Sequence, residues 1–232
     1  MMKNFTDFST NSTKIGLSGE NIRKKIELKN ERPIKEIYCL ILSYIEKIKE
    51  AEIPFPELYS HQIKNNEVIF DSKFEGYNLL QKQDVSNPPE WYNKNKGEIN
   101  KIFSILKQAQ NNKLDLDPHI KNFVINERGE IYYTDFFPPA QEDYYRLRLR
   151  IASEEKEILK EFFKVYHYST LGIHFFADLL KENNNFSQLS QEFYQLVRKH
   201  NLFDGSHEEF LEIAERIKSI ELERVKKQIS LF

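Results

Sequence analysis

The stretch LDLDPHIKNFVINERGEIYYTDFFPP, from Leu114 to Pro139, holds two short apolar runs separated by a turn and flanked by acids and amides. The tetrapeptide NERG between the runs is typical of a hairpin turn, so the runs are expected to pair as two strands. Asn122 begins the first run, and Asp135 directly follows the second. Because a tight hairpin brings its ends together, we expect these side chains to be neighbours, with Asp117 in the loop beside them.

These three residue types suit one kind of chemistry. Asn122 and Asp135 both offer hard oxygen donors, the ligands that Mg²⁺ prefers, often together with water and phosphate oxygens. Asp117 is close enough in sequence to orient a hydroxyl nucleophile beside such an ion. Phosphoryl transfer from ATP uses this combination, in which one carboxylate orients the acceptor while an amide and a second carboxylate hold the metal.

The rest of the chain predicts an α+β protein, with strands and one helix first and mainly helices later. Hydrophobic residues alternate in the strand candidates and recur at helical spacing in the helix candidates. Pro33 is expected to open the first helix, and the breaker SNPPEW at 86–91 is a plausible boundary between two parts. The expected strands are 4–8, 13–17, 22–28, 57–62, 67–74, 123–125 and 131–134, and the expected later helices include 98–110 and 207–229.

Composition excludes some classes of function. The chain has 232 residues and a formal net charge of −2 with both signs interspersed, so nothing favours nucleic acid or a membrane surface as partner. Its longest apolar run, 37–42, is far too short to span a bilayer, and the N-terminus lacks the apolar core of a signal peptide. The single cysteine, Cys39, cannot form an internal disulfide and is expected to be buried. A cytoplasmic location is expected.

The stretch also resembles a known superfamily. Residues 117–122, DPHIKN, look like the catalytic loop of protein kinase-like enzymes, and 135–137, DFF, look like their Asp-Phe-Gly element. The sequence DPHIKNFVI at 117–125 resembles the aminoglycoside phosphotransferase and choline kinase branch more than it resembles the Ser/Thr kinases. The resemblance implies a bilobal fold, with a small antiparallel-sheet lobe over 1–77 and a larger, mostly helical lobe over 78–232. The second lobe would contain the catalytic hairpin 114–139, and both lobes would form one catalytic unit.

The resemblance further implies a lysine that holds ATP phosphates and a glutamate that orients it. Lys24 and Lys25 compete for the first role, and the family expects an apolar residue two positions earlier. Ile22 meets that expectation for Lys24, whereas Lys25 has an arginine there. Glu36, near the start of the expected helix, is the preferred partner, and Glu46 is the second choice.

The remaining implied contacts are with nucleotide and metal. Backbone groups of Ser72 and Phe74 would bind adenine, and Asn11 would lie in the loop that covers the phosphates. Asp117 would be the catalytic residue, and Mg²⁺ would bind Asn122 and Asp135. The acceptor would be a small molecule, such as an amino sugar, a choline-like alcohol, a nucleoside or an antibiotic.

Departures from the family pattern keep two alternatives open. Asp115 stands where the family commonly has histidine, Phe137 replaces the glycine, and residues 8–13 contain no glycine. A degenerate kinase fold acting as a binding or scaffold protein would explain these changes. A metal-dependent glycosyltransferase using Asp115 and Asp117 is a further alternative. His119 is expected to anchor the loop through its ring, and His174 to be a packing residue. The oligomeric state is left open.

Overall fold

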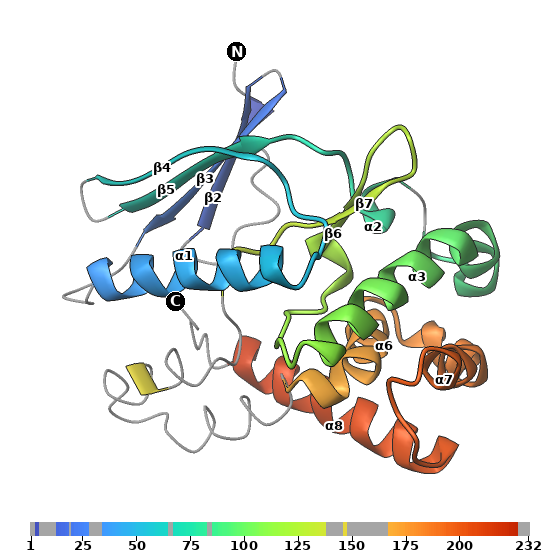
Figure 1. Cartoon of the computed structure of the whole chain (residues 1–232). Coiled ribbons are helices and arrows are strands. Elements are labelled where there is room, and N and C mark those ends of the chain that lie inside the picture. Colours follow the sequence, from blue (N-terminus) through green and yellow to red (C-terminus); the bar gives the residue numbers. More distant parts are fainter. Residues whose placement is uncertain are drawn as a thin grey trace.

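The computed structural model of this chain has an α+β fold, in which one small antiparallel sheet is followed by a mostly helical remainder (Figure 1). This agrees with the fold class expected from the sequence. The structure describes residues 3–4, 13–18, 20–27, 34–64, 67–82, 85–137, 146–147 and 167–226.

The sheet has five strands in the order β1-β2-β3-β5-β4, and neighbouring strands are antiparallel. Its strands are β1 (Lys3–Asn4), β2 (Thr13–Ser18), β3 (Asn21–Glu27), β4 (Leu58–Lys64) and β5 (Glu67–Lys73). The expected strands 13–17, 22–28, 57–62 and 67–74 are confirmed to within two residues over the described positions. Most of the candidate strand 4–8 lies outside them.

Helix α1 (Ile34–Glu50) covers one face of the sheet (Figure 1). Ile37, Ile41 and Ile45 recur every four residues and are buried, so they form one continuous apolar face. This face packs against Val68 and Phe70 of β5, within a hydrophobic cluster that also includes Phe136 and Phe137 after the hairpin. The helix predicted from the isoleucine spacing is thus confirmed, although Pro33 lies outside the described residues.

Helix α3 (Pro88–Asn111) begins ten residues earlier than the helix expected at 98. The prolines at 88 and 89 occupy its first two positions, where no backbone N–H is needed, and the side chain of Asn87 accepts a hydrogen bond from the N–H of Glu90. The interpretation of 86–91 as a breaker was therefore wrong, because this segment starts the helix.

The hairpin consists of β6 (Phe123–Ile125) and β7 (Ile131–Tyr133), as predicted. Asn126 Oδ1 accepts hydrogen bonds from the N–H groups of Arg128 and Glu130, which fixes the turn. The hairpin joins the end of the sheet through the N–H of Ile125, which donates to the carbonyl of Tyr77 at 3.0 Å. The hairpin therefore lies directly against the segment that leaves β5.

The remaining described elements form the helical part of the molecule. Helix α6 is buried on nearly every side, since Leu171 to Leu180 are all buried, and it has its most extensive contact with α8. The helix expected at 207–229 is confirmed over its described residues. These elements are α2 (Leu79–Lys82), η2 (Ile120–Asn122), η3 (Tyr168–Thr170), α6 (Leu171–Glu182), η4 (Asn184–Leu189), α7 (Ser190–Lys199) and α8 (His207–Lys226).

Two surface properties complete the description. Among the described helices, none is both long enough and apolar enough to cross a bilayer. Cys39, expected to be buried, is exposed, because it lies on the face of α1 that points away from the buried isoleucines.

Candidate functional site

A pocket lies between the sheet and the β6–β7 hairpin. Four of the eight site residues predicted from the sequence line it, namely Lys24, Ser72, Phe74 and Asn122. Aliphatic side chains also contribute to its walls, from the sheet on one side and from the hairpin on the other: Ile15, Leu17, Ile22 and Val124. The pocket thus combines apolar walls with a few polar groups, as small-molecule sites commonly do.

Lys24 reaches from β3 to the end of the hairpin. Its ammonium group donates a hydrogen bond to the carbonyl of Thr134 and lies 4.4 Å from the centroid of the Phe136 ring. Burial lowers the pKa of Lys24 to about 8, while the charge of Asp135 acts in the opposite direction. The pocket therefore contains a cation held against the segment that carries Asp135.

Asp135 is an acid in an environment that disfavours its charge. Burial and, next, the nearby Asp117 carboxylate raise the pKa of Asp135 to about 6, although Lys24 acts to lower it. Its Oδ1 accepts a hydrogen bond from the N–H of Phe137 at 3.2 Å. A divalent cation between Asp117 and Asp135 would relieve their repulsion.

Asn122 directly precedes the first strand of the hairpin, and Asp135 comes shortly after the second. The two chain ends of the hairpin are hydrogen-bonded to each other, as the sequence predicts. Its carbonyl accepts from the N–H of Thr134 at 2.8 Å and from the Thr134 hydroxyl at 3.2 Å. Its amide nitrogen donates to the carbonyl of Asp117 at 3.1 Å. These bonds bring the backbones of Asp117, Asn122 and Asp135 into one small region.

Asp117 is held from both its backbone and its side chain. Its N–H donates to the hydroxyl of Tyr133 at 2.9 Å, and its Oδ1 lies 3.2 Å from Nε2 of His119. The side chain is 21% exposed, although Oδ1 itself is buried. His119 does anchor this loop through its ring, as the sequence predicted.

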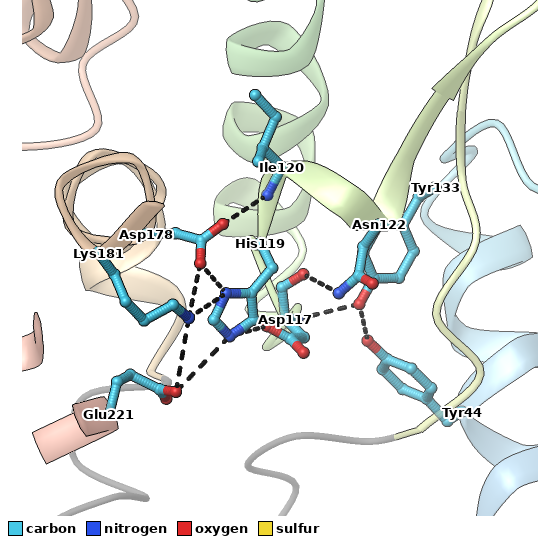
Figure 2. A network of polar contacts seen from close by, with 9 residues as sticks. All are labelled: Tyr44, Asp117, His119, Ile120, Asn122, Tyr133, Asp178, Lys181 and Glu221. Atoms are coloured by element: carbon cyan, nitrogen blue, oxygen red, sulfur yellow. Dashed lines mark hydrogen bonds and ion pairs between the residues drawn. The ribbon is translucent and has the colours of Figure 1, made fainter. Parts of the chain in front are cut away.

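His119 belongs to a buried polar network contributed by three segments of the chain (Figure 2). Its Nδ1 bonds to Oδ1 of Asp178, whose other oxygen accepts the N–H of Ile120 at 3.0 Å. Lys181 donates to Asp178 at 2.8 Å and lies 3.9 Å from Oε2 of Glu221. Helices α6 and α8 thus hold the loop that presents Asp117.

Two buried tyrosines form a second support for the same loop. Tyr44 of α1 donates to the carbonyl of Asp115 at 3.1 Å, and its hydroxyl lies 3.3 Å from that of Tyr133. Burial raises the pKa of both phenols well above the ordinary value. The Asp115 carboxylate accepts the N–H of Tyr168 at 2.6 Å, so Asp115 and Asp117 direct their side chains to different partners.

The segment expected to bind adenine lies along the pocket, but one of its groups is already engaged. The N–H of Phe74 donates to the carbonyl of Glu20 at 2.7 Å. Ser72 is buried in β5, opposite Ile22 of β3. A base at this edge would therefore have to use backbone groups other than the Phe74 N–H.

Three of the predicted residues, Asp117, Asp135 and Glu36, are not among the described residues that line the pocket. Glu36 is exposed and lines a separate hollow on α1 that also includes Cys39 and Arg146. Within the described residues, Lys24 contacts Thr134 and Phe136, and Glu36 lies at this other hollow, so the expected Lys24–Glu36 pair is not formed. The second choice, Glu46, bonds to Lys49 instead, at 2.7 Å. Asn11 lies outside the described residues.

The reason for the missing pair is the phase of α1. The positions of this helix that face the sheet and Phe136 are isoleucines, among them Ile37 and Ile41. Glu36 precedes Ile37 and so lies about 100° away from it around the helix, toward solvent.

Sequence reasoning missed the residues that support Asp117 from a distance. Asp178, Lys181 and Glu221 lie about 60 to 100 positions after the loop, and no local pattern links them to it. The one available signal was Asp178 itself, an acid within the otherwise apolar run LGIHFFADLL. A buried acid of this kind requires a partner.

The chain matches no protein-family model and no curated protein. The function must therefore be argued from the geometry of this site. Hard oxygens from Asn122 and Asp135 could hold a divalent cation, Lys24 could neutralise an anionic ligand in the pocket, and Asp117 could orient a polar group of a second ligand.

Proposed function

We propose that this chain is an ATP- and Mg²⁺-dependent phosphotransferase that acts on a hydroxyl of a small molecule. The proposal includes a bilobal, protein kinase-like arrangement with lobes over 1–77 and 78–232. The observation that carries it is the pocket between sheet and hairpin, where Lys24 from β3 meets the segment that follows β7 and Asn122 lines the same space.

In this proposal each polar group has one role. Lys24 binds phosphate oxygens, since it lines the pocket and its ammonium group reaches the end of the hairpin at Thr134. Asn122 and Asp135 hold Mg²⁺, which would also offset the charge that burial makes costly on Asp135. Asp117 orients the acceptor hydroxyl and takes up its proton as the new phosphorus–oxygen bond forms, while the bond between the γ-phosphorus and the bridging oxygen breaks and ADP leaves. The apolar walls and the edge at Ser72 and Phe74 receive the adenine.

A specific observation favours a second candidate, a nucleotide-binding protein without catalysis. Lys24 contacts Thr134 and Phe136, and Glu36 points elsewhere, so the lysine lacks the acidic partner expected of the active family. The two candidates share the nucleotide site and differ only in whether a phosphoryl group is transferred.

The first test is nucleotide binding by thermal denaturation. ATP with Mg²⁺ at 100 times its dissociation constant should stabilise the protein by about 2.7 kcal/mol, which raises the melting temperature by about 5–10 °C for a chain of this size. Asp135→Asn should lose most of this shift, and the exposed Asp204→Asn, a matched control, should keep it. The proposal would be contradicted if ATP with Mg²⁺ left the melting temperature of the parent protein unchanged. It would also be contradicted if nucleotide sugars raised the melting temperature and ATP did not.

The second test separates the two candidates. ATP consumption is measured with a panel of amino sugars, choline-like alcohols and nucleosides, in the parent and in Asp117→Asn. The phosphotransferase proposal expects transfer to at least one acceptor and a loss of about 10²–10⁴-fold in the variant, with ATP binding retained. Binding without transfer to any acceptor class would favour the non-catalytic candidate.

A further inference from the structure

A second group of donors lies behind Asp117 and is not used by the proposed function. His119 precedes η2, His174 belongs to α6 and Glu221 belongs to α8, and all three side chains are buried. One donor atom from each lies within 4.8 Å of the other two. We propose that these three residues bind a transition-metal ion, with zinc as the best fit, and that the ion fastens the loop of Asp117 to helices α6 and α8.

The distances between the three donor atoms are compatible with metal coordination if the donors move slightly closer together. Donor atoms about 2.0–2.1 Å from a tetrahedral zinc ion lie about 3.4 Å from one another. Nε2 of His119 lies 3.9 Å from Oε2 of Glu221, and the widest separation within the group is at most 4.8 Å. The rings of His119 and His174 are edge-on at 75°, with centroids 5.3 Å apart, so both can turn a nitrogen toward a shared point.

The orientation of His119 supports the proposal independently of the distances. Its Nδ1 is engaged by the carboxylate of Asp178, with Lys181 Nζ also 3.4 Å away, and its Nε2 faces Oδ1 of Asp117 at 3.2 Å and Oε2 of Glu221 at 3.9 Å (Figure 2). Histidines that bind metals commonly have their other ring nitrogen hydrogen-bonded to a carboxylate in this way, which fixes tautomer and direction. Asp178 is itself fixed by the N–H of Ile120 and by Lys181.

The local charge also favours a cation. Around the two histidines stand three carboxylates, Asp117, Asp178 and Glu221, and one ammonium group, Lys181, so with neutral imidazoles the sum is −3 + 1 = −2. Two of these carboxylates, Asp178 and Glu221, are only 2% exposed, and buried charges require compensation. A divalent ion would balance the group.

The donor set selects the kind of metal. Two imidazoles with a carboxylate suit zinc and similar transition metals, whereas Mg²⁺ prefers oxygen ligands alone. Lys181 is directed at Asp178, at 2.8 Å, and is 3.9 Å from Oε2 of Glu221, beyond hydrogen-bonding distance. Oδ1 of Asp117 lies 3.2 Å from Nε2 of His119 but is not counted among the ligands, because the proposed function uses this carboxylate to orient the acceptor.

The competing explanation is a doubly protonated His119 that bridges Asp117 and Asp178 without any metal. Both explanations account for the short contacts of the ring, but only one requires His174 and Glu221. Substitutions at these two residues therefore distinguish them.

The test uses the full chain, stripped of metals with a chelator and free of nucleotide. Titration with Co²⁺ should produce visible absorption bands that saturate at one equivalent, and Zn²⁺ should displace them. His174→Gln and Glu221→Gln should each weaken Co²⁺ binding at least tenfold. His200→Gln, a histidine of the same helical region outside the group, should bind as the parent does, and circular dichroism checks that each variant is folded.

X-ray absorption on the zinc-loaded parent keeps the proposal falsifiable if a variant does not fold. The expected spectrum shows imidazole and oxygen ligands at about 2.0–2.1 Å and no sulfur. A sulfur ligand would place the metal at the exposed Cys39 and overturn the proposal. So would the absence of stoichiometric binding, or unchanged binding in folded His174→Gln. None of these outcomes bears on the nucleotide tests, since this measurement uses no nucleotide.

Discussion

At the scale of single residues, Lys24 has the environment with the clearest chemical consequence. Its ammonium group is removed from water in the pocket, and the carbonyl of Thr134 and the ring of Phe136 replace only part of the lost hydration. Burial therefore favours the neutral amine and lowers the pKa to about 8, and the charge of Asp135 only partly counters this effect. A neutral lysine amine is a nucleophile.

We accordingly predict that Lys24 reacts with an amine-acylating reagent in a pH-dependent manner with a midpoint near pH 8. Since only the deprotonated amine reacts, and an ordinary lysine deprotonates near pH 10.4, Lys24 should be modified first as the pH rises through 8. Peptide mass spectrometry measures the rate, with the exposed Lys94 for comparison. ATP with Mg²⁺ should protect Lys24. A profile for Lys24 that follows Lys94 would contradict the prediction.

Tyr133 is the second residue whose role is defined by its contacts. Its buried hydroxyl accepts the N–H of Asp117 at 2.9 Å and lies 3.3 Å from the hydroxyl of Tyr44. Tyr133→Phe would leave the Asp117 N–H without this acceptor, so we expect a loss of about 1–3 kcal/mol in the free energy of unfolding. Chemical denaturation measures it. Tyr59→Phe, at a 49% exposed tyrosine, should stay within about 0.5 kcal/mol of the parent.

At the scale of elements, the junction between β5 and the hairpin depends on a glycine. Gly76 has φ of +136°, and a Cβ atom at this position would lie 2.1 Å from the carbonyl oxygen of Ile125. The close approach permits the next residue, Tyr77, to pair with Ile125. The hairpin is thereby fixed against the edge of the pocket.

Gly76→Ala should therefore destabilise the protein by at least about 2 kcal/mol, because both the backbone conformation and the contact exclude a side chain. Gly97→Ala is the matched control, since Gly97 lies inside α3 with no atom within 4 Å of an added Cβ. That change should stabilise the protein by roughly 0.5–1 kcal/mol. Both free energies of unfolding are measured by urea denaturation. Equal changes for the two variants would contradict the importance of the close contact between Gly76 and Ile125.

At the scale of the whole molecule, Phe136 links the sheet to the helical part. Its ring packs at 5.1 Å from that of Phe70 on β5 and at 5.2 Å from that of Phe55. It shares a buried cluster with α1, and it immediately follows the segment that bonds to Lys24. Because the pocket is bounded by both parts, we expect the two parts to unfold together.

Two probes can measure this coupling without further substitutions. The single Trp91 is buried in α3 against Phe186 and reports on the helical part, while a fluorophore on the single, exposed Cys39 reports on α1 beneath the sheet. Their unfolding curves in urea should coincide. Separate midpoints would show that the sheet and the helical part are independent units.

Phe136→Ala should shift both curves to lower urea by the same amount, with a cost of about 3–5 kcal/mol for the cavity left by a fully buried ring. A shift confined to the Cys39 probe would contradict the coupling inferred here. Phe203→Ala, at a partly buried ring beside the helical core, should cost less.

The sequence by itself determined the local features of this protein. Alternation and turn residues predicted β2, β3, β5 and the hairpin, and the isoleucine spacing predicted α1, because these patterns depend on neighbours only a few positions apart. The same reasoning predicted that Asn122 and Asp135 would stand at the joined ends of one hairpin. It failed at the start of α3, where two prolines fill positions that need no N–H donor.

Only the tertiary structure decided which side chains meet across long separations. The phase of α1 turns Glu36 to solvent and places isoleucines above Phe136, so Lys24 bonds to Thr134 instead. Helices α6 and α8 bring Asp178, Lys181 and Glu221 to His119 from about 60 to 100 residues away. These contacts depend on how the apolar faces of the helices pack. A local sequence pattern does not show which charged residues this packing will bury next to each other.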